Sequence, residues 1–205
     1  MSMGRTQAER RAATRGRLLA AARQLFADQG YAHTNREEVA ERAGVTRGAL
    51  YHHFDSKADL FAAVVRALDD EIAARVVSAS AGAGSVAETI DRAAAAYLDV
   101  CSSAQVARIM TDAQSVLGPT QLRQLSSESC LSLLTAALTR AAGEGAAVPG
   151  DPAVAAQLLL GTLNEAALLA ASTPGRGVPE PVSRTLREFL ARLLAPPGPP
   201  WRGRR

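Results

Sequence analysis

Three side chains close together in the sequence, Arg47, Tyr51 and Lys57, have the chemistry to bind nucleic acid. A guanidinium can donate two hydrogen bonds to the edge of a guanine, whereas a phenol and an ammonium suit phosphate oxygens. Lys57 also stands at a helix start, because Ser56 and Asp59 have the spacing of a capping box. Backbone amides and a cation meet there, so the pattern predicts an anion site.

The element that must carry the first two of these groups is a short helix beginning near Thr46. The Gly44-Val45 pair before it indicates a tight turn, because glycine tolerates positive φ and valine supplies apolar contact between helices. At 100° per residue, Leu50 and Phe54 share an arc that packs. The residues of the outward arc are Arg47, Gly48, Tyr51 and His52. Gly48 costs about 1 kcal/mol of helix propensity relative to Ala, which favours close approach of a partner.

A second short helix is expected before the turn. Thr34 and Glu37 have the spacing of a capping box, which predicts a helix start near Asn35. Its apolar stripe would be Val39, Ala40 and Ala43. Two short helices joined by a tight turn form a helix-turn-helix, which we expect at about residues 35–54.

Residues 17–65 resemble the N-terminal domain of TetR-family transcriptional regulators. The positions that carry the resemblance are Leu25, Phe26, Gly30, Tyr31, Thr34, Val39, Ala40, Ala43, Gly44, Val45, Gly48, Leu50, Tyr51, His53, Phe54, Ser56, Lys57 and Leu60. The rest of the chain is similar only in being a helical region of the right length. The resemblance implies a double-stranded DNA operator as the partner, with the helix from Thr46 in the major groove.

The resemblance also implies roles for single residues. The residues implied to approach base edges are Thr46, Arg47, Gly48 and Ala49. The residues implied to grip phosphates are Thr34, Tyr51, His53 and Lys57, and Arg36 is expected on the same DNA-binding surface. The helix wheel favours His52 over His53, but the family pattern selects His53 because the helix is expected to unwind near Phe54.

Charge is divided along the chain, whose formal net charge is +3. Residues 1–57 hold ten basic and six acidic side chains, whereas residues 58–195 hold ten basic and fourteen acidic ones. A basic N-terminal part followed by an acidic remainder suits a polyanion partner for the first part alone. The arginines before residue 18 either reach DNA or belong to a frayed terminus, and they do not adjoin an apolar signal-peptide segment.

The expected fold class is all-α, because no alternating strand pattern appears and apolar residues recur at helical spacing. We predict a three-helix DNA-binding domain at residues 14–74 and a larger helical ligand-sensing and dimerisation domain at residues 75–195. A linker helix is expected from Lys57 to about Ala79, and another helix from Pro119 to about Ala142. Two further helix starts are predicted from caps, Ser85 with Glu88 and Asp151 with Pro152. The proline-rich tail, residues 196–205, is predicted to be disordered.

The segment at residues 152–172 is apolar around most of its circumference, so it must be buried. A membrane span is the competing interpretation, but Asn164 and Glu165 near its middle weigh against it, since a central charge costs about 2.5–3.5 kcal/mol. Together with a last helix at residues 181–195, it is expected to form a four-helix homodimer interface, as in the resembling family. A symmetric dimer predicts a palindromic operator with half-sites about 34–36 Å apart.

The resemblance implies an unidentified small-molecule effector within the second domain. Candidate ligand-binding residues are Tyr97, Met110, Gln114 and Asn164, and the scarcity of aromatic side chains favours an apolar effector. Cys101 and Cys130 fit buried, reduced thiols. No cofactor and no metal site are expected, since the nearest cluster matches no zinc spacing: His52, His53, Asp55 and Asp59.

The expected function is therefore that of a cytoplasmic, bacterial, non-enzymatic regulator, a repressor released by its effector. A transcriptional activator of the same family is the nearest alternative. A helical enzyme or a protein-interaction module are the alternatives from other classes, but the sequence has no glycine-rich phosphate loop and no nucleophile elbow.

Overall fold

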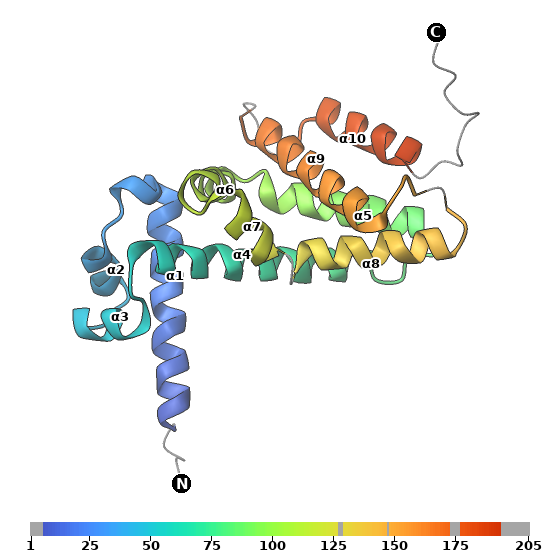
Figure 1. The fold of residues 1–205 in the computed structure, drawn as a ribbon. Coiled ribbons are helices and arrows are strands. Elements are labelled where there is room, and N and C mark those ends of the chain that lie inside the picture. The colour runs from blue at the N-terminus through green and yellow to red at the C-terminus, as the bar shows by residue number, and fades with distance from the viewer. Residues whose placement is uncertain (1–5, 127–128, 147, 173–176, 194–205) are drawn as a thin grey trace. The chain divides into compact units, whose positions relative to one another are not determined.

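The computed structural model describes residues 6–126, 129–146, 148–172 and 177–193, and over these ranges the chain is all-α, as predicted. Figure 1 shows the helices in chain order. Their bounds are α1 Gln7–His33, α2 Arg36–Arg42, α3 Arg47–His53, α4 Lys57–Ser80, α5 Val86–Cys101, α6 Ala104–Val116, α7 Gly118–Ser126, α8 Cys130–Gly143, α9 Pro152–Ser172 and α10 Glu180–Leu193. The tail predicted to be disordered, residues 196–205, lies outside the described residues.

Packing divides the chain into two units. Unit 1 comprises Met1–Leu68 and Ala104–Leu125, and unit 2 comprises Asp69–Ser103 and Ser126–Arg205. The first half of α4 therefore belongs to unit 1 and its second half to unit 2. The sequence alone predicts a single boundary near residue 74, whereas packing returns α6 and nearly all of α7 to the N-terminal unit.

The core of unit 1 joins α1 to the two short helices. Leu50 and Phe54, the predicted packing arc of α3, are 0% and 2% exposed, which confirms that arc. Other fully buried side chains of this unit come from α1, α2 and α4: Leu18, Phe26, Val39, Leu60, Phe61 and Val64. Burial of a large apolar side chain contributes about 1.5–3 kcal/mol relative to its exposure, so this core fixes α2 and α3 against α1.

The turn between α2 and α3 has the predicted geometry. Gly44 adopts a φ of 63°, and its N–H donates to the carbonyl of Glu41 at 3.0 Å. The N–H of Val45 donates to the carbonyl of Ala40 at 3.0 Å, so the turn satisfies carbonyls that the end of α2 leaves open. Thr46 is the N-cap of α3, because its Oγ1 accepts the N–H of Ala49 at 3.2 Å. The predicted turn and helix start are both confirmed.

The start of α2 differs from the prediction. Its N-cap is Asn35, whose Oδ1 accepts the N–H of Glu38 at 2.8 Å. Thr34 is 2% exposed and donates its hydroxyl to the carbonyl of Gly30 at 2.8 Å. The predicted Thr34–Glu37 capping box is therefore wrong. A non-helical residue within α1, Gly30 with φ 81° and ψ 168°, brings a carbonyl within reach of the threonine.

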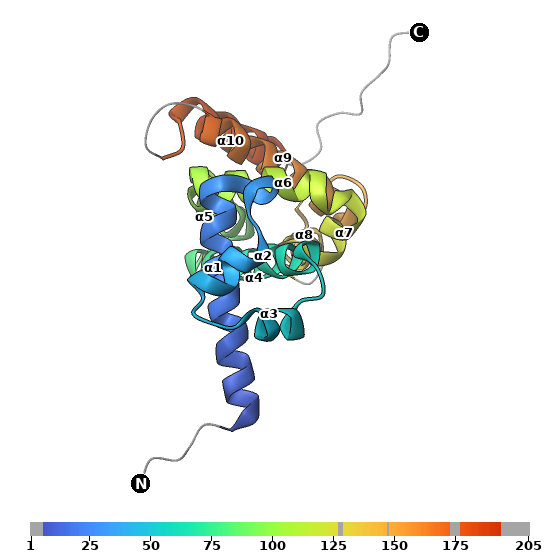
Figure 2. The same ribbon diagram turned by 90° about the vertical axis from the view of Figure 1, so that its left-hand side faces the viewer.

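Unit 2 is built around α9, which contacts α5, α8 and α10. Helices α9 and α10 run side by side in both ribbon views (Figures 1 and 2). By length and composition α9 could cross a membrane, but it buries small and large apolar residues inside the unit, including Ala156, Leu159 and Ala170. It is therefore the core helix of this unit, as the sequence predicts.

Two helix starts in unit 2 agree with the prediction from the sequence, but one predicted helix is interrupted. Ser85 Oγ accepts the N–H of Glu88 at 3.1 Å, and Asp151 Oδ1 accepts the N–H of Ala153 at 2.7 Å, which confirms both predicted caps. The single helix predicted from residue 119 to residue 142 is wrong, because α7 ends and α8 begins within it. Ser129 has non-helical φ and ψ and donates its hydroxyl to Asp70 Oδ1 at 2.7 Å, so a contact with α4 replaces helical geometry there.

Gly30→Ala is expected to lower the free energy of unfolding by about 1–3 kcal/mol, because this backbone region is nearly restricted to glycine. The added Cβ would also stand 3.3 Å from Asp112 Oδ2. The matched control is Gly16→Ala in the same helix, where the Cβ meets open space, and a gain of about 0.5–1 kcal/mol is expected. Urea denaturation followed by circular dichroism measures both, and equal stability of the two variants would contradict this account of Gly30.

Candidate nucleic-acid interface

One face of α3 is turned to solvent. Arg47, Gly48 and His52 are exposed, and Tyr51 is 43% exposed, as the helix wheel predicts. Ala49 beside them is half-buried. Apart from Gly48 itself, its two chain neighbours and the nearby backbone of α3, no described atom lies within 4 Å of the point where a Cβ on Gly48 would stand. The fold therefore does not require glycine at this position, and the backbone of α3 is open to close approach from outside.

Two residues of α2 hold Tyr51 in place. Its hydroxyl donates to Glu37 Oε1 at 2.8 Å, and the Arg36 guanidinium lies 4.3 Å from the centre of its ring. Arg36 Nη1 also donates to the carbonyl of Asp55 at 2.9 Å, just beyond the end of α3. Arg36 is thus half-buried and tied to its neighbours, and it orients the phenol beneath it.

The contact between Tyr51 and Glu37 sets the protonation of both groups. Donation to the carboxylate raises the pKa of Tyr51, because ionisation of the phenol would place two negative charges together. The same hydrogen bond lowers the pKa of Glu37, with its own backbone amide as the next cause. At neutral pH the phenol is therefore a hydrogen-bond donor, and an anionic oxygen already occupies the place of its acceptor.

Lys57 at the start of α4 is held by the end of α1. Its Nζ donates to the carbonyl of Ala32 at 3.2 Å and lies 4.3 Å from the centre of the Tyr31 ring. Burial lowers the pKa of this half-buried lysine. The ammonium therefore has a fixed position beside the helix start that Ser56 caps, where Ser56 Oγ accepts the N–H of Asp59 at 2.9 Å.

The two histidines of α3 differ in exposure. His52 is exposed and His53 is half-buried. Burial is the largest cause that lowers the pKa of His53, followed by the charges of Arg11, His52 and Arg15. Because the ordinary pKa of histidine is already below 7, the His53 imidazole is neutral at pH 7 and can donate a hydrogen bond without adding charge.

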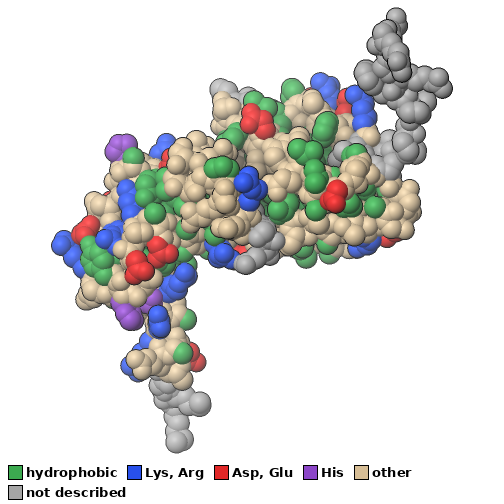
Figure 3. Space-filling view, in the orientation of Figure 1, with side chains coloured by type: hydrophobic (Ala, Val, Ile, Leu, Met, Phe, Trp, Pro, Cys, Tyr) green, Lys and Arg blue, Asp and Glu red, His purple; other side chains and the backbone are tan. Residues whose placement is uncertain are grey.

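The described arginines before residue 18 lie on a helix and not on a frayed terminus. Helix α1 begins at Gln7, and all of these arginines except Arg5, which lies outside the described residues, are within it. The Arg15 guanidinium stands 5.1 Å from the centre of the Phe54 ring, and Arg17 Nη1 donates to the carbonyl of Gly44 at 3.4 Å. Figure 3 shows basic and histidine side chains together at this end of unit 1.

Unit 1 thus brings together most of the residues that the sequence selected for nucleic acid. Thr34 is the exception, since it is buried and its hydroxyl is engaged by the carbonyl of Gly30. Glu37 was not predicted from the sequence to be the partner of Tyr51. The two residues lie fourteen positions apart on different helices, so no local spacing rule could have found the pair.

Unit 2 contains a cavity of about 650 Å³ between α4, α5, α8, α9 and α10. Its walls are mostly apolar and include Ile90, Leu134, Leu159 and Leu163. Of the four residues predicted to bind a ligand, Tyr97 lines this cavity, and its hydroxyl donates to Asn164 Oδ1 at 2.5 Å. Asn164 therefore lies behind Tyr97, while Met110 and Gln114 lie on α6 in unit 1 and outside this wall.

Both cysteines are buried thiols in unit 2. Burial raises the pKa of Cys101 to about 12 and raises the pKa of Cys130 as well, so both stay protonated at neutral pH. Over the described part of the chain, no group of three or more His, Cys, Asp or Glu residues is arranged to hold a metal ion.

Two family profiles match this chain. Residues 18–64 match bacterial regulatory proteins of the tetR family, and residues 87–196 match the tetracyclin repressor-like C-terminal domain. A TetR-family transcriptional regulator from Pectobacterium atrosepticum has a similar structure, with a TM-score of 0.68 and 34% identity over 92% of this chain and 94% of that one. The structure of RolR in complex with resorcinol, at 19% identity, shares the fold with a TM-score of 0.71, over 92% of this chain and 90% of that one.

Two curated relatives match the N-terminal part alone. The activator FasR of Mycolicibacterium smegmatis is 44% identical over 62 residues, which is 30% of this chain and 28% of FasR. The repressor BepR of Brucella suis is 46% identical over 63 residues, which is 31% of this chain and 30% of BepR. The matched region thus spans less than a third of either relative, and it is shared by proteins of opposite effect on transcription.

Proposed function

This chain belongs to the TetR family of DNA-binding transcriptional regulators, and we propose that it is a cytoplasmic homodimeric repressor released from its operator by a small apolar effector. The family is one of regulators and not of enzymes. Repression is favoured because a dimer seated over a promoter excludes polymerase. Activation is the alternative, and a reporter behind the target promoter separates the two, since loss of the protein raises expression only in the case of a repressor.

The observation that supports operator binding best is the exposed face of α3, with Arg47, Gly48 and Tyr51 on it. We assign base contacts to the first residues of this region: Thr46, Arg47, Gly48 and Ala49. We assign phosphate contacts to Tyr51, His53 and Lys57, and Arg36 supports them by holding Tyr51. Thr34 is not assigned a phosphate because it is buried.

Arg47→Ala and Lys57→Ala are expected to weaken operator binding in different ways. Loss of the guanidinium should relax discrimination at one base pair of each half-site by about 1–3 kcal/mol. Loss of the ammonium should weaken binding to all duplexes alike and reduce the slope of log K against log salt by about one for each phosphate that is no longer neutralised. Selection from random duplexes, followed by fluorescence anisotropy at several salt concentrations, measures both effects.

The charge control for this pair is Arg75→Ala, an exposed arginine of unit 2 that pairs with Asp99. It should leave the selected sequence and the salt slope unchanged. Undiminished binding in both the Arg47 and Lys57 variants, or selection of sites without two-fold symmetry, would contradict the proposed operator contacts.

Homodimerisation is supported by apolar side chains that α9 and α10 leave at the surface. Val154 and Leu158, one helical turn apart on α9, are 59% and 69% exposed, and Phe189 on α10 is 48% exposed. Hydrophobic side chains reach the surface over these helices in Figure 3. A monomer would leave this area in water, whereas a two-fold pairing of α9 and α10 would bury it.

Leu158→Glu is therefore expected to convert the dimer into a monomer, because two carboxylates would be brought into an apolar interface about a two-fold axis. Sedimentation velocity at micromolar concentration measures the change, and operator affinity should fall with it. Leu158→Met, which keeps the apolar contact, serves as the control and should remain dimeric. A wild-type protein that sediments as a monomer would exclude this part of the proposal.

The effector is proposed to occupy the cavity of unit 2. Its volume of about 650 Å³ suits a small organic molecule, and its apolar walls favour a ligand with few polar groups. The hydroxyl of Tyr97 is engaged by Asn164, so it offers the ligand its remaining acceptor capacity. RolR, which shares the fold, has been crystallised with resorcinol, a small aromatic molecule.

Ala93→Phe is expected to abolish effector response, because its side chain would fill space that Ala93 now leaves open on the cavity wall. Neutral aromatic compounds would be screened for those that lower operator affinity of the wild-type protein. Ala95→Phe, on the exposed side of the same helix, is the matched control and should keep the response. A response that survives in the Ala93 variant would place the effector elsewhere.

A further inference from the structure

Two side chains of α6 contact α1 on either side of Gly30. Arg108 Nη1 donates to the carbonyl of Asp28 at 2.6 Å, and Asp112 Oδ2 accepts the N–H of Tyr31 at 2.7 Å. Arg108 and Asp112 are four residues apart and so lie on the same face of α6. Both ribbon views show α6 beside the C-terminal end of α1, and all of these residues belong to unit 1 (Figures 1 and 2).

The two contacts meet α1 where its helix is interrupted. Gly30 has non-helical φ and ψ. At such an interruption, some backbone amides and carbonyls lose the hydrogen-bond partners that a regular helix would provide. Arg108 supplies a donor before the interruption, and Asp112 supplies an acceptor after it. The hydroxyl of Thr34 meanwhile donates to the carbonyl of Gly30 at 2.8 Å, so the peptide between Gly30 and Tyr31 is held at both of its polar atoms.

The last turn of α1 connects the peptide held by α6 to Lys57. The Tyr31 ring rests against Phe26 and Phe61, with ring centres 5.9 Å and 4.9 Å away. Lys57 Nζ lies 4.3 Å from the centre of the same ring and donates to the carbonyl of the next residue, Ala32. Only residues 31 and 32 therefore separate the carboxylate of Asp112 from the ammonium of Lys57.

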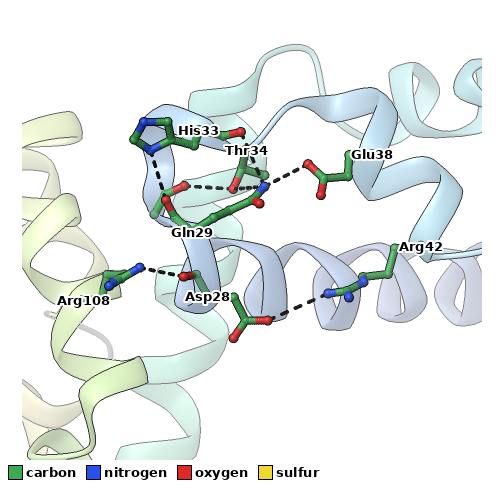
Figure 4. A network of polar contacts seen from close by, with 8 residues as sticks. Asp28, Gln29, His33, Thr34, Glu38, Arg42 and Arg108 are labelled. Carbon is green, nitrogen blue, oxygen red and sulfur yellow. Dashed lines mark hydrogen bonds and ion pairs between the residues drawn. The ribbon is translucent and has the colours of Figure 1, made fainter.

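A second branch leads from Arg108 to the helix-turn-helix (Figure 4). Asp28, whose carbonyl accepts from Arg108, places its carboxylate 4.0 Å from Arg42 at the end of α2. Gln29 Nε2 donates to Glu38 Oε2 in α2 at 2.8 Å. The segment of α1 that forms hydrogen bonds with α6 therefore also forms polar contacts with α2.

We propose that Arg108 and Asp112 of α6 are positioning residues for the DNA-binding surface, and that Asp112 acts through Tyr31 and Ala32 to hold Lys57 where it meets a phosphate. Neither residue touches DNA in this scheme. The proposal rests on the proposed function, because it assumes that Lys57 binds operator phosphate. According to this proposal, α6, which is remote in sequence from the helix-turn-helix, contributes to operator affinity.

The alternative is that the two contacts only stabilise unit 1. If the contacts are only structural, removing them would lower the stability of the protein and the fraction of active protein. The effect on binding would then be the same whether or not Lys57 is present. A positioning residue that acts through Lys57 must lose its effect when Lys57 is absent, which a double-mutant cycle measures directly. It must also change the salt dependence of binding, which a smaller fraction of active protein would leave unchanged.

The test uses the full-length protein and the duplex that the wild-type protein selects most strongly from a random library, labelled with fluorescein. Asp112→Ala should weaken binding on the order of tenfold and reduce the salt slope by about one for each phosphate that Lys57 no longer neutralises. Asp112→Asn keeps an oxygen that can accept from the Tyr31 N–H, so it should restore most of the affinity. In a Lys57→Ala background, Asp112→Ala should have little further effect.

Ser115→Ala, an exposed change on the same helix, is the matched control and should bind as the wild type does. Arg108→Ala tests the second contact and does not depend on the Asp112 variant folding. It should weaken binding several-fold while the salt slope stays near that of the wild type, because Lys57 keeps its partners. Thermal unfolding of each variant fixes the fraction of folded protein at the temperature of the assay.

The outcomes distinguish a failure of the positioning role of α6 from a failure of the proposed operator contact of Lys57. If Lys57→Ala lowers affinity and salt slope while Asp112→Ala and Arg108→Ala behave like the Ser115 control, α6 has no positioning role and the inference is wrong. Full additivity of the Asp112 and Lys57 changes would also overturn it. If the wild-type protein selects no duplex, or Lys57→Ala leaves the salt slope unchanged, the proposed operator contact itself fails.

Discussion

The proposed DNA-binding surface depends on apolar burial between α1 and the short helices beside it. Helices α2 and α3 have seven residues each, far too few to persist alone in water, since isolated helices shorter than about 12–15 residues are marginal. Leu50 and Phe54 are buried in unit 1, and this burial rather than helix propensity gives α3 its place. That packing also fixes the positions of Arg47 and Tyr51, because they lie on the exposed arc of the same helix.

Polar contacts then fix the orientation of the Tyr51 and Lys57 side chains, whose helices are placed by the apolar core. Tyr51 donates to Glu37 beneath the guanidinium of Arg36, and Lys57 is held by Tyr31 and Ala32. Such contacts have two consequences for an incoming phosphate. They reduce the side-chain entropy lost on binding. At Tyr51 a phosphate must compete with Glu37, because the phenol has a single donor, whereas the Lys57 ammonium has three and gives one to the carbonyl of Ala32. The proposed phosphate contact of Lys57 therefore adds to the contact that holds it, and the α6 contacts bear on that position.

In unit 2, one helix serves two surfaces. Leu159 and Leu163 of α9 face the cavity proposed for the effector, whereas Val154 and Leu158 of the same helix reach solvent at the face proposed for dimerisation. A helix that is apolar around most of its circumference can do both, which accounts for a composition that resembles a membrane span. A ligand that shifts α9 would change the cavity and the dimer face together, so the two proposals are physically linked.

Features that depend on neighbours in the chain could be predicted from the amino-acid sequence: the all-α class, the turn at Gly44, the helix starts at Thr46 and Ser85, and the buried arc of α3. These follow from caps and from helical periodicity, which act over a few residues. Three features could not be predicted in this way: Thr34 bonds to Gly30 and leaves the cap to Asn35, Ser129 divides a predicted helix, and α6 joins unit 1. The Thr34 contact spans only four residues, but it depends on the non-helical backbone at Gly30. The other two depend on partners brought near by folding, as with Tyr31 and Asp112, which are 81 residues apart. Contacts at that separation are fixed by the packing of whole helices, so no local pattern in the sequence encodes them.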